Sequence, residues 1–177
     1  NFSAAVTTHK PIGGFLTAPS PGVVSVFLQN QYYPDDDAYL EALAECLQHE
    51  YQAIVASGAT LQLDCPDLAM GRHVVHQNKT VEEFRRVAAR HIEVLNAATA
   101  KIPPGSMRIH LCWGNYQGPH HHDIDLSDIL DLVYSARPHA IAIEGANPRH
   151  AHEWAVFDQH PLPDDKVVIP GVVDSTS

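Results

Sequence analysis

Short apolar runs alternate with amphipathic helical segments along most of this 177-residue chain. The runs have the length of strands, and apolar residues make up most of each one. Runs of this kind, separated by helices, are typical of parallel strands that are covered by crossover helices. We therefore expect an α/β fold in which helices cover a parallel sheet.

Five strands and four helices are expected from the periodicity and from the residues that flank each run. The expected strands cover residues 22–28, 60–64, 107–112, 139–144 and 167–173. One helix follows the acidic residues 35–37, ends at Gly58 and contains Cys46, which we expect in the core. A second begins at the capping box of Thr80 and Glu83. Two more are expected near 126–136 and 150–157.

Charge and cysteine usage restrict the partners and the compartment. The chain has 21 Asp and Glu residues against 11 Lys and Arg residues, a formal net charge of −10. This excess disfavours nucleic acid and anionic membranes as partners. Three cysteines without regular spacing argue against a disulfide framework and fit a reducing, cytoplasmic location. No run of residues approaches the length of a membrane span.

The length suits a single domain over residues 1–177, and no linker divides the chain. The chain begins at Asn1 without an initiator Met and stops shortly after a strand-like run, so we expect a fragment of a longer protein. The oligomeric state stays open, a homo-oligomer included.

Polar side chains stand at the ends of several expected strands. His110 and Cys112 are two residues apart on one strand, so their side chains point to the same face. Glu144 ends the next strand, and Asp64 ends an earlier one. Nitrogen, sulfur and oxygen donors of this kind are the ligands that zinc prefers. The alternatives are structural packing for either residue of the first pair and an ion pair with Arg149 for Glu144. For Asp64 the alternative is a cap of the turn that follows through Pro66.

The positions of these residues favour a barrel over a nucleotide-binding sheet. Gly-rich phosphate loops are absent, which counts against a doubly wound nucleotide domain. In a (β/α)8 TIM barrel, the carboxyl ends of all strands face one rim, where the chemistry takes place. Because eight units usually need ~250 residues, we expect a partial barrel in this chain.

Five segments of the chain carry a resemblance to a known family: 14–19 (GFLTAP), 61–66 (LQLDCP), 109–113 (IHLCW), 141–144 (IAIE) and 170–174 (PGVVD). In this order they resemble the catalytic domain of cobalamin-independent methionine synthase and its relatives. The resemblance implies that His110, Cys112 and Glu144 bind zinc. It also implies that Asp64 holds the amino group of a thiol amino acid. In that family a further Cys, beyond the segment that matches Asp174, completes the zinc site.

The resemblance implies a zinc-dependent transferase that binds a homocysteine-like thiol as a zinc thiolate and alkylates it, as in methionine biosynthesis. Zinc is suited to this chemistry because only the thiolate attacks carbon well, and the metal removes the thiol proton. The partners are then a small-molecule thiol and a methyl or alkyl donor. A net charge of −10 is a poor match for a polyglutamylated folate, so another donor is possible.

Two alternatives stay open for the function. The first is an enzyme similar to epoxyalkane:coenzyme M transferase, which a cationic clamp for a sulfonate would favour. An Asp placed to bind an ammonium group, as Asp64 could be, favours an amino-acid thiol instead. The second is a barrel whose metal site binds a ligand without turnover. A closed site of four protein ligands would favour that reading.

The chain departs from the methionine synthases at three places. Where they have a His shortly after the segment that matches Asp174, this chain has Ser175 and Thr176. Cys65 occupies the position where an acidic residue is expected after Asp64. The loop 113–123 (WGNYQGPHHHD) is also unlike the synthases.

This loop contains three consecutive histidines, His120, His121 and His122. We expect the loop to lie over the active-site rim, with these side chains as the candidate catalytic proton donors. A solvated loop and a second metal-binding patch are the alternatives. Residues expected to line the substrate pocket, with ordinary rim packing as the alternative, are Trp113, Tyr116, Asn147 and Arg149.

Overall fold

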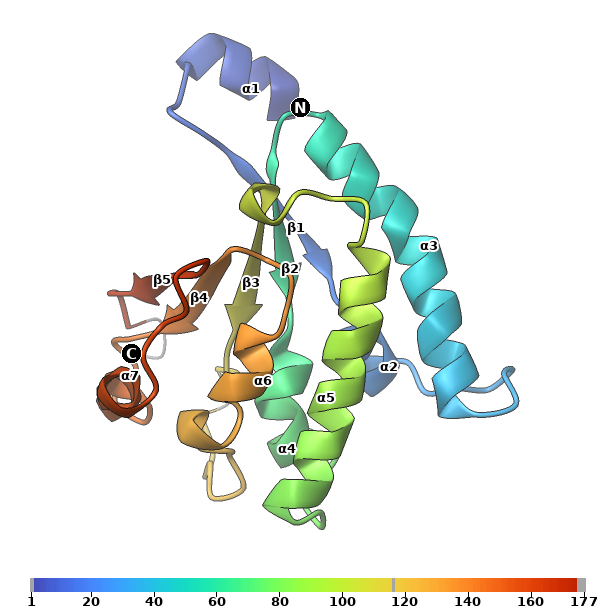
Figure 1. Ribbon diagram of the computed structural model, residues 1–177, viewed down its shortest axis with the longest axis vertical. Helices are drawn as coiled ribbons and strands as arrows, with labels where there is room; N and C mark the ends of the chain where they lie inside the picture. The colour runs from blue at the N-terminus through green and yellow to red at the C-terminus, as the bar shows by residue number, and fades with distance from the viewer. Residues whose placement is uncertain (1, 116, 175–177) are drawn as a thin grey trace.

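The computed structural model describes residues 2–115 and 117–174 and contains a five-stranded parallel sheet (Figure 1). Each strand pairs with the strand that follows it in the chain, in the order β1-β2-β3-β4-β5. The strands are β1 (Phe15–Pro19), β2 (Thr60–Asp64), β3 (Met107–Leu111), β4 (Ala140–Glu144) and β5 (Val167–Gly171). The expected α/β fold with a parallel sheet is therefore confirmed.

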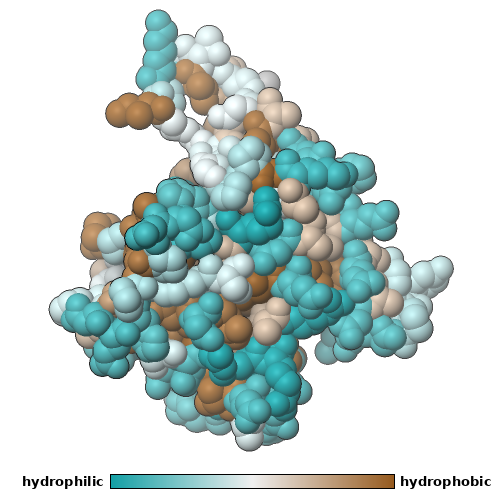
Figure 2. Space-filling view, viewed as in Figure 1, coloured by the Kyte–Doolittle hydropathy of each residue, from teal (hydrophilic) through white to brown (hydrophobic). Residues whose placement is uncertain are grey.

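Helices fill the connections between these strands. The two long ones, α3 (Asp36–Ala56) and α5 (Val81–Ala98), lie side by side against the sheet (Figure 1). The shorter helices are α1 (Phe2–His9), α2 (Pro21–Phe27), α4 (Met70–Val74), α6 (Leu130–Tyr134) and α7 (Val156–Gln159). Single 3-10 turns are η1 (Pro66–Leu68), η2 (Pro104–Ser106), η3 (Leu126–Asp128) and η4 (Ala151–Ala155). α1 buries no residue and projects from the top of the molecule in Figure 1 and Figure 2.

In the described part of the chain, the helices bury one face of the sheet and leave the other partly exposed. Along β2, Leu61 and Leu63 are fully buried, whereas the residues between them remain partly exposed. β3 and β4 show the same alternation, with Ile109 and Ile141 buried in the same core cluster. Because side chains alternate between faces, the opposite face carries the partly exposed residues. These are the positions that bear the polar residues of the expected site.

The expected strand over residues 22–28 is wrong, because this segment forms the helix α2. Ser20 caps the helix through its Oγ, which accepts a hydrogen bond from Val23 N at 2.9 Å, and Pro21 occupies the first turn. The strand lies earlier in the chain, as β1. β-branched residues favour strands only weakly, so the cap and tertiary packing decide the outcome.

The other four expected strands begin and end within two residues of the observed β2, β3, β4 and β5. The capping box of Thr80 and Glu83 is confirmed at the start of α5. The helices α1 and α4 were not expected.

Cys46 is exposed, contrary to expectation, because it lies roughly 240° around the helix from the buried Leu40. Among the residues that the structure describes, no helix has the length and apolar character needed to cross a bilayer.

A buried polar group fixes α2 against the rest of the fold. Ser20 Oγ donates to Asp67 Oδ1 at 2.7 Å, and His91 Nδ1 lies 2.9 Å from Asp67 Oδ2. All three residues are buried. Gly22 packs so closely on this group that an added Cβ would overlap Asp67 and come within 2.5 Å of His91 Nδ1.

Replacing Gly22 with Ala should therefore destabilise the fold by about 1–3 kcal/mol, since the Cβ displaces hydrogen-bonded buried groups. The free energy of unfolding, measured by urea denaturation, tests this. Gly105→Ala is the matched control, because no atom lies within 4 Å of a Cβ added there. Equal stability of the two variants would contradict the expectation.

Candidate functional site

The strand-end residues expected from the sequence meet at the carboxyl edge of the sheet. Asp64 ends β2 and is the register partner of His110 in β3. Glu144 ends β4, which pairs with β3 on its other side. Three neighbouring strands thus bring a carboxylate, an imidazole and a second carboxylate to one edge, on the face that the helices leave open.

Asp64 and His110 are in direct contact. Asp64 Oδ1 lies 2.6 Å from His110 Nδ1, and both side chains are about a third exposed. This bond holds the orientation of the imidazole ring. It also leaves Nε2 as the ring nitrogen that can take another partner, such as a metal ion.

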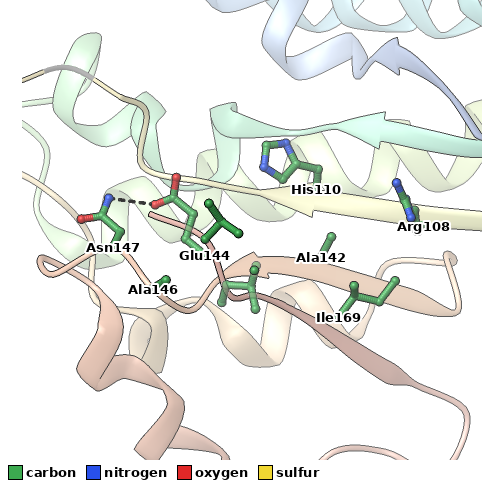
Figure 3. A pocket seen from close by; sticks show the side chains of 10 residues that line it. Arg108, His110, Ala142, Glu144, Ala146, Asn147 and Ile169 are labelled. Carbon is green, nitrogen blue, oxygen red and sulfur yellow. Dashed lines mark hydrogen bonds between the residues drawn. The ribbon is translucent and has the colours of Figure 1, made fainter. Parts of the chain in front are cut away.

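His110 lines a pocket of about 190 Å³ (Figure 3). Arg108, His110, Glu144 and Asn147 are its polar side chains. Asn147 Nδ2 donates a hydrogen bond to Glu144 Oε2 at 3.2 Å, shown as a dashed line in Figure 3. The ion pair considered for Glu144 and Arg149 is not among the contacts of the described residues. Arg149 Nη1 instead lies 3.1 Å from a ring nitrogen of another expected site residue, His120.

Cys112 directly follows the last residue of β3. Burial, with the negative charges of Glu144 and Asp64, raises the pKa of its thiol to about 11. The group is therefore protonated at neutral pH in the absence of a cation. The possible ligand atoms of His110, Cys112 and Glu144 do not all lie within 4.8 Å of one another, so the three need side-chain rotation to share a metal.

A second polar cluster lies on the segments that follow β3 and β4. His120 Nδ1 lies 2.7 Å from Asp123 Oδ2, and His150 Nε2 lies 2.9 Å from the same oxygen. The indole of Trp113 stacks on the His150 ring, with centroids 4.1 Å apart. Among the described residues, these two histidines and Asp123 form the group whose spacing suits a metal ion.

His150 lies between two carboxylates. Its Nδ1 is 3.3 Å from Glu153 Oε1, on the opposite side of the ring from Asp123. Burial disfavours the charged ring, but hydrogen bonds and charge attraction from both carboxylates outweigh it and raise the pKa of His150 to about 9. Burial likewise opposes ionisation of Asp123, yet the two histidines hold its pKa below the usual value. The cluster therefore keeps a buried cation at neutral pH.

The three histidines expected as proton donors take different positions. The side chain of His120 lies within the cluster and is 7% exposed. His121 is exposed, and its ring contacts those of His73 and His122. Slight burial and neighbouring positive charges lower the pKa of His122. These side chains do not line the pocket beside His110.

The expected substrate residues also separate. Asn147 lines the pocket, as expected. Trp113 is buried, and its Nε1 donates to Ile124 O at 2.7 Å, so it packs beneath the rim and does not line the pocket. Tyr116 lies outside the described residues.

Sequence reasoning did not identify Asp123, His150, Glu153 or Arg108 as site residues. A signal was present, because two pairs have the i,i+3 spacing that brings side chains together in a turn: His120 with Asp123, and His150 with Glu153. Nothing in the spacing alone indicates that the two turns meet. Comparison with known proteins adds no further assignment: no protein-family model matches the chain, and no curated protein matches its sequence.

The stability of the metal-free protein should fall as the pH rises from about 6.5 to 9. The folded-state pKa of His150 lies above the unfolded value, so its contribution is complete below the unfolded pKa and is lost on deprotonation. We expect a loss on the order of 3 kcal/mol. Urea unfolding in EDTA across this range measures it.

The matched variants are His150→Gln, in which this pH dependence should disappear, and His152→Gln, in which it should remain. His152 is exposed and lies in the same segment. The same slope in both variants would show that another group causes the pH dependence.

Proposed function

We propose that this chain forms part of a (β/α)8 barrel that alkylates a zinc-bound thiol, in the manner of the cobalamin-independent methionine synthases that it resembles. The observation that carries the proposal is the meeting of Asp64, His110 and Glu144 at one edge of three neighbouring parallel strands, with Cys112 next to them. Barrel enzymes use this edge for catalysis.

The sheet supports the barrel part of the proposal. Sequential parallel strands, with helices on one face, are what an arc of a barrel contains. Phe15 and Val167, on the two edge strands, and Ile169 are large apolar residues that remain partly exposed. Further strands that closed the barrel would cover these side chains, because the inner face of such a barrel is packed.

The donor set fits zinc. His110 supplies nitrogen, Cys112 sulfur and Glu144 oxygen, which are the three donor types that zinc sites use. The Asp64–His110 contact has the form of the carboxylate–histidine pairs that orient metal ligands. Bound zinc would lower the pKa of an incoming thiol and fix its sulfur at the open coordination position.

The protein groups around that position have separate roles in the proposal. Asp64 Oδ1 orients His110, which leaves Oδ2 to accept a hydrogen bond from the ammonium group of an amino-acid thiol. Asn147 holds one oxygen of Glu144 and so leaves the other for the metal. The pocket beside them can hold the rest of a small substrate.

Arg108 favours a second candidate, an enzyme similar to epoxyalkane:coenzyme M transferase. It lies in the same pocket, two residues before His110, and it forms no ion pair with any described residue. Its Nε donates to Gln62 Oε1 at 2.7 Å, and its guanidinium carbon lies 3.7 Å from the centroid of the Phe15 ring. A guanidinium held in this way can bind the sulfonate or carboxylate of a short thiol.

Zinc analysis of the wild-type protein and Cys112→Ser tests the metal assignment. We expect the variant to lose one equivalent of zinc, because a thiolate ligand is removed. Cys46→Ser should lose none, since Cys46 is exposed on α3. Homocysteine should add one sulfur to the zinc coordination of the wild type, measured by X-ray absorption.

Zinc retained unchanged in Cys112→Ser would overturn the ligand assignment. Zinc that binds without accepting the homocysteine sulfur would favour a barrel that holds a metal without this turnover. A closed shell of four protein ligands would point the same way.

Arg108→Met distinguishes the two thiol classes. If Arg108 binds the acidic group, the affinity of the zinc protein for 2-mercaptoethanesulfonate should fall about 10-fold or more. Its affinity for 2-mercaptoethanol should stay the same. Arg86→Met is the control, because Arg86 is exposed, lies outside this pocket and pairs with Glu82 on the same helix. Equal losses for the charged and the neutral thiol would count against an anion clamp at Arg108.

A further inference from the structure

We propose that His120, Asp123 and His150 form a second metal site, which binds a divalent transition-metal ion independently of the strand-end residues. Their ligand atoms all lie within 4.8 Å of one another. The two nitrogen–oxygen distances are 2.7 and 2.9 Å. Ligands about 2.1 Å from a shared metal lie roughly 3.0–3.4 Å apart, so the two nitrogen–oxygen distances need to lengthen only by tenths of an ångström.

An unsatisfied carboxylate oxygen points independently to a cation at this place. Asp123 is only 9% exposed, and both histidines bind its Oδ2. The other oxygen, Oδ1, is buried and accepts no hydrogen bond from the described residues. His73 Nδ1 lies 3.7 Å from it, beyond hydrogen-bond distance. Leaving such an oxygen unsatisfied is costly, and a metal ion bound by both carboxylate oxygens of Asp123 would relieve the cost.

The neighbours of His150 hold its ring in one orientation, as the residues around a metal-binding histidine do. Glu153 Oε1 lies 3.3 Å from His150 Nδ1, so that nitrogen keeps its proton while Nε2 binds the metal. Glu153 is itself held by the backbone N–H of Leu126, which donates to Oε2 at 2.9 Å. Trp113 covers one face of the ring. The orientation of His150 is thus fixed before any metal arrives.

Metal binding requires a defined rearrangement of protons. The metal takes the place of the protons through which His120 Nδ1 and His150 Nε2 contact Asp123. The proton of neutral His120 then resides on Nε2, which lies 3.1 Å from Arg149 Nη1. The protonated His120 Nε2 and Arg149 Nη1 are then both hydrogen-bond donors and cannot bind each other. The Arg149 side chain must therefore turn away.

The site would act as a cross-link between two segments at the carboxyl edge. His120 and Asp123 follow β3, whereas His150 follows β4. Two imidazole nitrogens and one carboxylate oxygen favour zinc, cobalt or iron(II) over magnesium and calcium. The same two segments contain Cys112 and the pocket residue Asn147, so a bound ion would restrain the backbone that carries both.

Cobalt and zinc titrations in a Cys112→Ser background test the proposal without the strand-end site. We expect one equivalent of Co²⁺ to bind with visible d–d bands and without a sulfur-to-cobalt charge-transfer band. Adding His150→Gln should weaken binding at least tenfold, whereas adding the matched His152→Gln should not. Equal Co²⁺ affinities in these two double variants would overturn the second site, as would a lack of Co²⁺ binding to Cys112→Ser itself. Either result would do so whether or not the strand-end residues bind zinc.

Two further measurements keep the test independent of a folding defect. Nitrogen-15 NMR of the histidine rings should show Zn²⁺ shifting His120 Nδ1 and His150 Nε2, with His152 unaffected. Arg149→Met should tighten zinc binding about tenfold, because the competing donor at His120 Nε2 is removed. Zinc-induced shifts confined to other histidines would contradict the proposal, as would weaker binding in this variant.

Discussion

Parallel pairing of each strand with its successor is the constraint on which the rest of this structure depends. Each connection has to run back along the helical face before the next strand can begin. All five carboxyl ends therefore lie at one edge, and the segments that follow β3 and β4 become neighbours. Both polar groups described above follow from this arrangement, although they use different residues.

The two groups differ in how their charge is balanced. Asp64, His110 and Glu144 are partly exposed, beside an open pocket, where a substrate or ion can reach them. His150 and Asp123 are enclosed by protein and neutralise each other in the metal-free state. Removing one partner of an enclosed pair of this kind is costly, because it leaves an uncompensated buried charge. It is therefore suited to fixing the position of two segments.

Much of the sheet could be predicted because its signals are local. β2 and β4 begin and end within one residue of expectation, and α5 begins at a capping box that short-range hydrogen bonds define. The segment at 22–28 has a local helix start at Ser20 and Pro21, but its β-branched residues favour a strand. The packing of Gly22 against Asp67 and His91, which lie far away in the sequence, could not be predicted.

The strand-end residues could likewise be placed from alternation alone, whereas the cluster at Asp123 could not. His120 and His150 are 30 positions apart, and only the pairing of β3 with β4 brings them to one carboxylate. The sequence suggested Glu144 as the partner of Arg149. Arg149 contacts His120 instead, because the pairing of β3 with β4 brings their following segments together.

The stacking of Trp113 on His150 gives the protein an optical probe of its own. Trp113 is buried, whereas the other tryptophan, Trp154, is exposed to solvent. A protonated imidazole in contact with an indole quenches its fluorescence, and a buried indole emits at shorter wavelength than an exposed one. The blue side of the emission spectrum thus reports the state of the ring beneath Trp113, at the junction of the two segments, without any added label.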